Sequence, residues 1–514
     1  MIRKKLKNRL LFIGALILML VFGSFKYASA TDPVNPNATP EAKALLNVFY
    51  AISGKYTLTG QHNYPGTKDQ NSRFAAKYAG QTPVIWSSDM GFAKEGDKDS
   101  YLARPDIVRE AIRQHKKGSI ITICWHAVPP TANEPITFQP QGKVSPDSLA
   151  SVQGRLPDEQ FKQILTPGSR LYNKWAAQVD TIAVYLKKLQ DAHVPVLWRP
   201  YHEMNGDWFW WGGRVGENST IDLYRQLYDR LVNYHKLNNL IWIWNVDRPG
   251  TPIRKFSNFY PGDKFLDIAS LDVYGSDFNQ AYYDSLIVLA KGKPIIFGEV
   301  GNPPTIDVLK NQPKWASWVI WAGMVKNISQ KQYQALVNDS RMLSLDNPKY
   351  WEIIAPYRKA CKLPLLPLKA KYQLTFSGKW VFNEEMSNLG QSGSENVPGE
   401  MEIDQDENIL YAKKHMIAEY GNDLITNEEI LLDGTEMKSE FYNSPRISIA
   451  TINDNSNSLM ISSVVKFNRG GQLTELKSSE EWSLQQGGKV LKIVQSSTGF
   501  RGEVTKIILV FDKK

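Results

Sequence analysis

The sequence predicts an α/β fold, a (β/α)8 TIM barrel, followed by a small antiparallel all-β domain that is either a barrel or a sandwich. Two features predict the barrel. Eight short strand segments alternate with helical segments over roughly 320 residues, and these segments are almost wholly apolar, as expected for parallel strands covered by helices. Beyond residue 365 the composition shifts toward Ser, Asn, Gly, Glu and Lys, and apolar residues recur at every second position, which predicts antiparallel strands.

The first 30 residues have the pattern of a secretory signal peptide. A basic start precedes an apolar run over residues 10–22 and the small residues Ala28-Ser-Ala30. A membrane-spanning helix needs about 20 apolar residues, so this run is short for an anchor. We expect cleavage after Ala30 and a secreted protein, extracellular or periplasmic, with no integral membrane association after cleavage. An uncleaved anchor is the alternative.

The formal net charge of +9 is concentrated in this leader. Residues 1–30 hold six basic and no acidic side chains, which leaves +3 for the rest of the chain. A charge this small gives no reason to expect a nucleic acid or membrane partner, and we expect a monomer. The two cysteines form no CxxC motif, and we expect a core thiol at Cys124 and a surface thiol at Cys361. A disulfide between them is the alternative for a secreted protein.

The barrel elements can be placed along residues 31–365. The predicted strands cover residues 57–59, 84–86, 120–125, 196–198, 240–244, 268–273, 294–297 and 318–321. Thr39-Pro40 opens the first predicted helix, residues 171–189 carry an apolar residue at every third or fourth position, and residues 350–362 form the last helix. A doubly wound open sheet is the alternative fold, but no Gly-rich phosphate loop follows the first strand.

Polar and aromatic side chains follow the predicted strands. In a TIM barrel the carboxyl ends of all strands meet at the face that carries the chemistry. The residues found there are His62, Asp89, His126, Arg199, His202, Glu203, Asn245, Asp272, Tyr274, Glu299 and Trp321. Because every strand contributes at least one such residue, we predict a functional site at this face of the barrel.

The longest motif is Arg199-Pro-Tyr-His-Glu-Met-Asn-Gly-Asp-Trp-Phe-Trp-Trp-Gly212. Its ionisable groups end a strand and its aromatic residues form the loop that follows. Aromatic faces stack on the C–H faces of sugar rings, and leaving three polar groups in a core without a function would be unfavourable. This motif resembles the acid/base signature of glycoside hydrolase family 26, which is best known for endo-β-1,4-mannanases.

The resemblance implies a two-glutamate mechanism. By that resemblance Glu203, after the fourth strand, is the general acid/base, and Glu299, after the seventh, is the nucleophile of a retaining glycosidase, which implies carboxyl groups about 5–5.5 Å apart. We expect Glu203 to keep its proton near neutral pH in its tryptophan-lined setting. We expect Glu299 to stay ionised through donors, for which Arg199 and Tyr274 are the candidates.

The resemblance also implies substrate-binding residues. His126 and His202 match family histidines near the cleaved sugar, and Asp272-Val-Tyr274 matches the family pattern beside the nucleophile. Trp208 and Trp321 are expected sugar platforms. The remaining predicted contacts are Arg199, Asp272 and His62, the last of which is as consistent with a structural role. No metal site and no cofactor are predicted.

The segment 366–514 forms the predicted C-terminal β domain of about eight strands. Gly378-Lys-Trp380 and the segment from Glu481 to Ile493 resemble parts of lipocalin-like modules. A carbohydrate-binding sandwich is the alternative. Of 15 tryptophans only Trp380 and Trp482 fall in this segment, and both are consistent with core positions, so no ligand face is assigned.

The function predicted from the sequence is a secreted retaining endo-β-1,4-mannanase acting on mannan, galactomannan or glucomannan. The resemblance leaves open a β-1,3-xylanase or a mixed-linkage β-glucanase, because family 26 contains both. A non-catalytic polysaccharide-binding barrel is the alternative from a different class. The two glutamates favour the enzyme, because a binding protein needs neither of them.

Overall fold

The computed structural model divides into two compact units, with the division between Leu368 and Lys369. The residues that it describes are 32–91, 103–140, 148–368, 373–390, 397–406, 409–416, 424–441, 444–453, 457–469, 472–499 and 502–514. The predicted signal peptide lies outside these residues. Among the described residues, no helix is long and apolar enough to cross a membrane.

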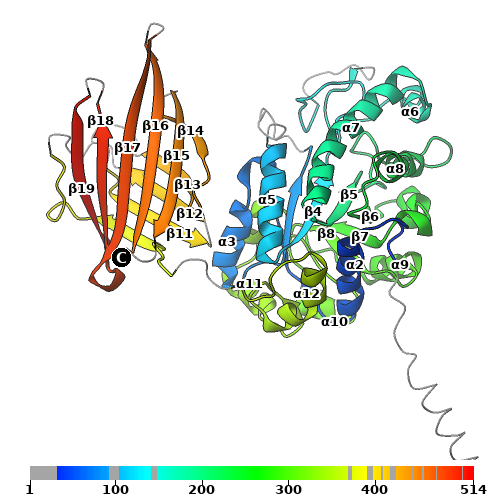
Figure 1. Cartoon of the computed structure of the whole chain (residues 1–514). Helices are drawn as coiled ribbons and strands as arrows, with labels where there is room; N and C mark the ends of the chain where they lie inside the picture. The colour runs from blue at the N-terminus through cyan, green and yellow to red at the C-terminus, as the bar shows by residue number, and fades with distance from the viewer. Residues whose placement is uncertain are drawn as a thin grey trace, which may run out of the picture. The chain divides into compact units, whose positions relative to one another are not determined.

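A parallel sheet of seven strands forms the centre of the first unit (Figure 1). The strands follow one another in sequence order, and each pairs with its neighbour in parallel register. They are β2 (Gly60–His62), β3 (Ile85–Asp89), β4 (Ile120–Trp125), β5 (Val196–Pro200), β6 (Leu240–Asp247), β7 (Ile268–Val273) and β8 (Ile295–Val300). Two further short strands, β1 (Thr57–Leu58) and β9 (Met342–Leu343), pair in parallel beside the sheet.

Residues 315–320 occupy the place of the eighth strand and close the sheet into a barrel. They form isolated parallel bridges to β8 on one side and to β1 and β2 on the other. Val300 donates its backbone N–H to Val319, and Ile320 donates to Gly60, at 2.8 and 3.1 Å. The predicted (β/α)8 barrel is therefore confirmed, with an eighth segment that pairs irregularly.

Helices surround the strands (Figure 1). They are α2 (Pro40–Ile52), α3 (Gln70–Ala79), α5 (Arg104–Lys117), α6 (Asp158–Leu165), α7 (Arg170–Asp191), α8 (Thr220–Tyr228), α9 (Gln280–Ala290), α10 (Ile306–Asn311), α11 (Gln330–Val337) and α12 (Pro348–Ala360). The predicted cap of α2 is present, because the Thr39 hydroxyl accepts the N–H of Ala42 at 3.2 Å.

The barrel has two apolar cores, one on each face of the strands. Alternate residues of each strand face opposite sides. Ile121 and Ile123 of β4 pack outward against the helices, whereas Ile120 faces a second cluster with residues of α2 and α12. The inward positions are apolar at the start of the strands and polar at their ends, as in Leu197 followed by Arg199. This gradient leaves the polar groups at the carboxyl-end face.

The second unit contains one antiparallel sheet of ten strands that curves into a near-barrel (Figure 1). The strands are β10 (Gly378–Phe382), β11 (Glu400–Asp406), β12 (Ile409–Met416), β13 (Leu424–Leu431), β14 (Met437–Phe441), β15 (Ser444–Asn453), β16 (Ser458–Arg469), β17 (Gln472–Gln485), β18 (Val490–Thr498) and β19 (Val504–Lys513). Consecutive strands pair except for β13 and β14, which stand at the two ends of the sheet order, and β10 pairs with β19. The expected count of about eight was therefore too low, and the sheet is not a sandwich.

Trp380 and Trp482 are fully buried in the apolar core of this second unit. Their indole N–H groups donate to the Phe376 carbonyl and to Glu480. Both tryptophans are thus core residues. Both cysteines are free and buried, so the expectation of a surface thiol at Cys361 was wrong: Cys361 directly follows α12 and belongs to an apolar cluster of the barrel unit.

Candidate active site

A cavity of about 450 Å³ opens among the polar ends of the barrel strands. Its lining comes from the carboxyl ends of β6 and β8, from the loops after β4, β5, β6 and β7, and from the segment after the eighth strand position. The lining residues are His126, Phe138, Gln153, His202, Glu203, Trp208, Phe209, Asp247, Arg248, Tyr274, Glu299, Trp321 and Met324. Glu203 and Glu299 line the same cavity although they lie far apart in the chain.

A β-bulge places Glu299 in the cavity. In the pairing of β7 with β8, Leu271 lies opposite Phe297 and Asp272 lies opposite Glu299, so Gly298 is the extra residue. A bulge shifts the alternation of side chains by one position. Gly298 and Glu299 therefore both face the barrel interior. A Cβ atom on Gly298 would lie only 2.5 Å from the Ser270 hydroxyl, so only glycine fits without displacement.

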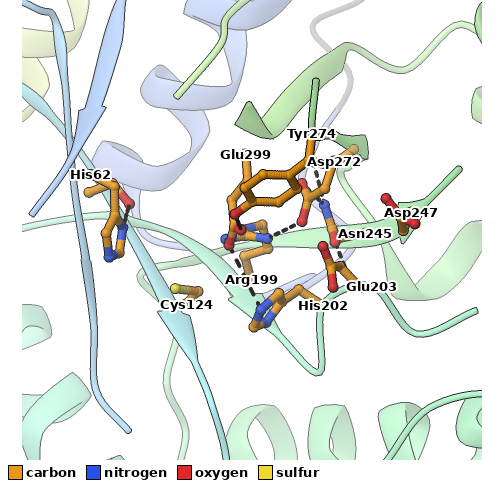
Figure 2. A network of polar contacts seen from close by, with 12 residues as sticks. His62, Cys124, Arg199, His202, Glu203, Asn245, Asp247, Asp272, Tyr274 and Glu299 are labelled. Atoms are coloured by element: carbon orange, nitrogen blue, oxygen red, sulfur yellow. Dashed lines mark hydrogen bonds and ion pairs between the residues drawn. The ribbon is translucent and has the colours of Figure 1, made fainter. Parts of the chain in front are cut away.

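Three side chains hold the Glu299 carboxylate. Arg199 donates from Nη2 to Oε1 of Glu299, and Tyr274 donates its hydroxyl to Oε2 at 2.6 Å (Figure 2). Nε2 of His202 lies 3.8 Å from the same Oε1. Burial alone would raise the pKa of Glu299, but the charge of Arg199 and the hydrogen bonds from Tyr274 and Arg199 lower it below its usual value. Glu299 is therefore ionised at neutral pH.

Glu203 has the opposite electrostatic setting. Burial, followed by the negative charges of Asp272, Glu299 and Asp247, raises the pKa of Glu203 well above its usual value. Trp208 donates its indole N–H to Oε2 of Glu203 at 2.6 Å, which opposes this rise. Burial also raises the pKa of Asp272, but Arg199 pairs with Asp272 and with Glu299 and favours the ionised form of both. Glu203 is therefore the carboxyl group to which we assign the proton.

Asn245, near the end of β6, bonds both to the backbone of Glu203 and to Asp272, the residue that pairs with Arg199. Its Oδ1 accepts the backbone N–H of Glu203 at 2.7 Å, and its Nδ2 donates to Asp272 at 2.8 Å and to Ser270 at 2.9 Å (Figure 2). Glu203 has a φ of 50°, a conformation that is strained for a residue with a side chain. The bond from Asn245 fixes this backbone turn, so one amide sets the position of Glu203 and the orientation of Asp272.

Aromatic rings form the walls of the cavity. Trp208 and Trp321 line it directly. Phe209 stacks on Trp211 at 4.5 Å between ring centres, and the indole N–H groups of Trp210 and Trp211 donate to the backbone carbonyls of Ala127 and His202. Trp210 and Trp211 therefore pack the loop, which leaves Trp208, Phe209 and Trp321 available to a ligand.

Two histidines lie beside the Glu299 carboxylate. His126 and His202 face each other through their Nε2 atoms, 3.1 Å apart. Nδ1 of His126 bonds to Oδ2 of Asp89, at the end of β3. Burial lowers the pKa of His202 well below its usual value, so this imidazole is neutral.

Comparison with known proteins identifies the family of the first unit. The sequence model of glycosyl hydrolase family 26 matches residues 34–347. The chain belongs to glycosyl hydrolase family 26. The matched residues include every side chain of the cavity and end before the second unit.

Several relatives of this family 26 chain carry names that state an activity. It is 32% identical over 335 residues to a mannan endo-1,4-beta-mannosidase of Thermothelomyces thermophilus, which covers 62% of this chain and 63% of that protein. It is 30% identical over 354 residues to a mannan endo-1,4-beta-mannosidase of Bacillus subtilis, covering 62% of this chain and 89% of the relative. The chain thus spans less than two thirds of the length of the first of these relatives.

Solved structures support the family 26 fold. The structure of GH26A from Muricauda sp. MAR_2010_75 is 40% identical, has a TM-score of 0.56, and aligns with 61% of this chain and 98% of its own. The aligned share is about the length of the family match over residues 34–347, and the second unit lies outside that match.

The structure brings together most of the residues predicted for the family 26 site. Seven of them line the cavity: His126, His202, Glu203, Trp208, Tyr274, Glu299 and Trp321. Arg199 and Asp272 lie beneath it as an ion pair of 2.9 Å. His62 is buried behind Trp321, with ring centres 3.8 Å apart, and its Nδ1 bonds to the Ser87 hydroxyl at 2.8 Å. His62 therefore supports the Trp321 ring and is not among the residues that line the cavity.

Other residues of the site had no predicted role. The sequence places Asn245 and Asp89 at the carboxyl-end face of the barrel, but no function was assigned to either of them. Phe138 and Gln153 come from the long loop between β4 and α6, where no motif marks them. Asp247 and Arg248 extend β6 into the cavity wall, beyond the predicted end of that strand.

Two groups of side chains in the described residues are close enough to hold a metal ion. One oxygen from each of Glu203, Asp272 and Glu299 lies within 4.8 Å of the other two, and Asp89, Cys124 and His126 form the second group. Hydrogen bonds account for both arrangements. Arg199 and Asn245 both donate to Asp272 in the first group. In the second group, Cys124 and His126 both bond to Oδ2 of Asp89.

Proposed function

We propose that this chain is a secreted endo-β-1,4-mannanase that cleaves with retention of configuration. The observation that carries the proposal is the pair of glutamates on one cavity with opposite protonation. Glu203 keeps its proton and Glu299 stays ionised, which are the states needed for an acid and a nucleophile. A binding protein would gain nothing from this pairing, so it favours the enzyme over a non-catalytic barrel.

The separation of the two carboxyl groups supports retention. Retaining glycosidases have carboxyl groups about 5–5.5 Å apart, and inverting ones about 6.5–9.5 Å, because the latter must admit a water molecule. The nearest oxygens of Glu203 and Glu299 lie within 4.8 Å of each other. This spacing leaves room for one anomeric carbon and its leaving oxygen.

The proposed reaction has two steps. In the first, a Glu299 oxygen attacks the anomeric carbon while Glu203 gives its proton to the leaving glycosidic oxygen. In the second, Glu203, now ionised, takes a proton from water, and that water displaces Glu299. Arg199 and Tyr274 hold the attacking carboxylate throughout, and they stabilise it again when it leaves.

The choice of substrate rests on the relatives. The proteins from T. thermophilus and B. subtilis are both named mannan endo-1,4-beta-mannosidases. We therefore expect mannan, galactomannan or glucomannan as substrate. The two aromatic platforms, Trp208 and Trp321, suit any pyranose chain, so a β-1,3-xylan or a mixed-linkage β-glucan is separated from mannan only by measurement.

A comparison of substrates tests the proposal. The purified protein is incubated with mannan, galactomannan, glucomannan, β-1,3-xylan and barley β-glucan, and the products are sized over time. We expect internal cleavage of the mannans, with a mixture of oligosaccharides appearing before any monosaccharide. NMR of the first product should show the β anomer. An α anomer as first product would refute retention, and cleavage of xylan or glucan in preference to mannan would refute the substrate assignment.

The proposed secretion has its own test. The chain is expressed with its first 30 residues, and the mature protein is isolated from the medium or the periplasm. An N-terminus at Thr31 is expected, because cleavage follows Ala30 in the predicted signal peptide. Recovery with the membrane fraction and an intact leader would point to the anchor instead.

A further inference from the structure

Asp89 has no part in the two chemical steps, yet it is fully buried directly behind the histidines of the site. Its Oδ1 accepts the backbone N–H groups of Gly91 and His126 at 2.7 and 3.2 Å. Its Oδ2 accepts from the Cys124 thiol at 2.8 Å and bonds to Nδ1 of His126. Burial would raise the pKa of Asp89, but its pairing with His126 and these donors hold the pKa well below the usual range. Asp89 is therefore an ionised acceptor.

An ionised acceptor fixes the tautomer of His126. Nδ1 of His126 must carry a proton to donate to Asp89, so in the neutral form of this ring Nε2 presents a lone pair. This lone pair faces Nε2 of His202 at 3.1 Å. Two lone pairs cannot face each other at that distance, so Nε2 of His202 carries the proton between the rings.

The other nitrogen of His202 supports the same assignment. Among the described residues, Nδ1 of His202 is buried and has no hydrogen-bond partner. A proton at Nδ1 would be a buried donor without an acceptor, which is unfavourable by about 1–3 kcal/mol. The proton of the neutral ring therefore lies at Nε2, which is also 3.8 Å from Oε1 of Glu299.

We infer that Asp89 is a positioning residue: through His126 it holds His202 with its Nε2–H toward the Glu299 carboxylate. The inference rests on the proposed function, because it assigns this hydrogen to the support of the nucleophile. Asp89, His126, His202 and Glu299 thus form one ordered chain of contacts from β3 to β8. Within the part of the chain that the structure describes, the other charged or titratable groups that face these four residues are Cys124, His62, Arg199, Asp272, Tyr274 and Glu203.

Asp89→Asn is the informative variant because the backbone dictates how the amide must sit. The two backbone N–H groups at Oδ1 require an oxygen there, so the amide nitrogen takes the place of Oδ2. It then donates to Nδ1 of His126, which moves the His126 proton to Nε2. Nε2 of His202 must then accept from His126, so its proton moves to Nδ1. The hydrogen that faced the Glu299 carboxylate is lost.

Kinetics and NMR test the inference together. For Asp89→Asn we expect kcat on mannan to fall about tenfold to a hundredfold, in line with other carboxylates that orient functional histidines. The acid limb of the kcat/KM profile should move up by about one pH unit, because Glu299 loses a favourable dipole and is protonated more easily. KM should change little. Cys124→Ser, which keeps a donor to Asp89, is the matched control and should retain the wild-type profile.

The tautomers are read from ¹⁵N-histidine spectra of the full chain, with thermal unfolding as the check of folding. The wild type should show protonated Nδ1 on His126 and protonated Nε2 on His202, and Asp89→Asn should show both reversed. A wild-type His126 without a proton at Nδ1, or an unchanged pH profile in a folded Asp89→Asn, would overturn the inference. If Asp89→Asn does not fold, the wild-type spectrum alone decides. Because the spectra need no turnover, absence of mannan hydrolysis by the wild type would refute the proposed function and leave this inference open to the NMR result.

Discussion

Trp208 donates its indole N–H to Oε2 of Glu203 at 2.6 Å, and the two residues are only five positions apart in the sequence. The loop is tight: a Cβ atom on Gly206 would lie 2.3 Å from the Trp208 ring. The same ring lines the cavity, so one side chain both contacts the ligand space and tunes the proposed acid. The bond favours the ionised form of Glu203 and thus partly offsets the rise in its pKa that burial and the nearby carboxylates cause.

Trp208→Phe should move the basic limb of the kcat/KM profile to higher pH. Activity is lost as pH rises through the pKa of Glu203, since the acid must be protonated. Removing a donor that lowers this pKa raises it further, by about 0.5–1 unit. Trp210→Phe is the matched control, because its indole N–H bonds to the Ala127 carbonyl instead. A basic limb that moves equally in both variants would contradict a specific effect on Glu203.

Glu299→Ala should abolish turnover while leaving oligosaccharide binding intact. Without the carboxylate no glycosyl-enzyme can form, and a loss of kcat on the order of 10⁴-fold or more is expected for a nucleophile. Binding is measured by isothermal titration calorimetry with a manno-oligosaccharide. Glu217→Ala, at an exposed position outside the cavity, should behave as the wild type. Hydrolysis by Glu299→Ala within tenfold of the wild type would remove Glu299 from the nucleophile role.

Glu203→Ala should lose more activity on substrates whose leaving group must be protonated than on substrates whose leaving group departs as an anion. On mannan we expect kcat to fall by about 10²–10⁴-fold, the usual contribution of a general acid. On an aryl glycoside with a dinitrophenolate leaving group, the first step needs no proton and should stay close to the wild-type rate. Stopped-flow release of the phenolate measures that step. Equal losses on both substrates would argue against Glu203 as the acid.

The sequence predicted the barrel and the two glutamates because both depend on local patterns. Apolar strands at regular spacing predicted the fold, and the segment around Glu203 is specific enough to indicate the family. Contacts across the barrel have no such local signal. The pairing of Asp89 with His126 and the amide bridge made by Asn245 depend on which strands lie side by side. The same applies to Phe138, which reaches the cavity from a long loop without a periodic pattern.

Two further differences between the predicted and the observed structure have physical reasons. The bulge at Gly298 arises from the register between β7 and β8, and the only local sign of it is a glycine inside a strand. The second unit has more strands than predicted, and β13 shows one reason: it carries polar residues on both faces, which hides its alternation. Alternation predicts a strand only where one face is apolar.

Gly298→Ala should lower both stability and kcat although it adds only one methyl group. That methyl group would meet the Ser270 hydroxyl, Asp272 and Asn245 at 2.5–2.8 Å. Relieving the overlap must move the polar groups that orient Glu203 and Arg199, so we expect a loss of about 1–3 kcal/mol in unfolding free energy. Chemical denaturation and steady-state kinetics measure the two effects. Gly323→Ala, where a Cβ meets nothing within 4 Å, is the control. A fully active Gly298→Ala would show that the bulge does not set the site.

Removal of residues 369–514 should leave a soluble and active barrel. The two apolar clusters of the barrel unit lie within residues 34–366, and the third cluster lies within 374–511, so each unit has its own core. The cut must follow residue 368, because Leu363 and Leu366 pack against the cluster that contains α2 and α12. We expect the truncated chain to unfold cooperatively and to hydrolyse short manno-oligosaccharides with wild-type kcat, as measured by thermal unfolding and product analysis. A chain that ends at residue 360 should be less stable than one that ends at residue 368, because it exposes that cluster. Aggregation of the chain that ends at residue 368 would show that the barrel depends on the second unit.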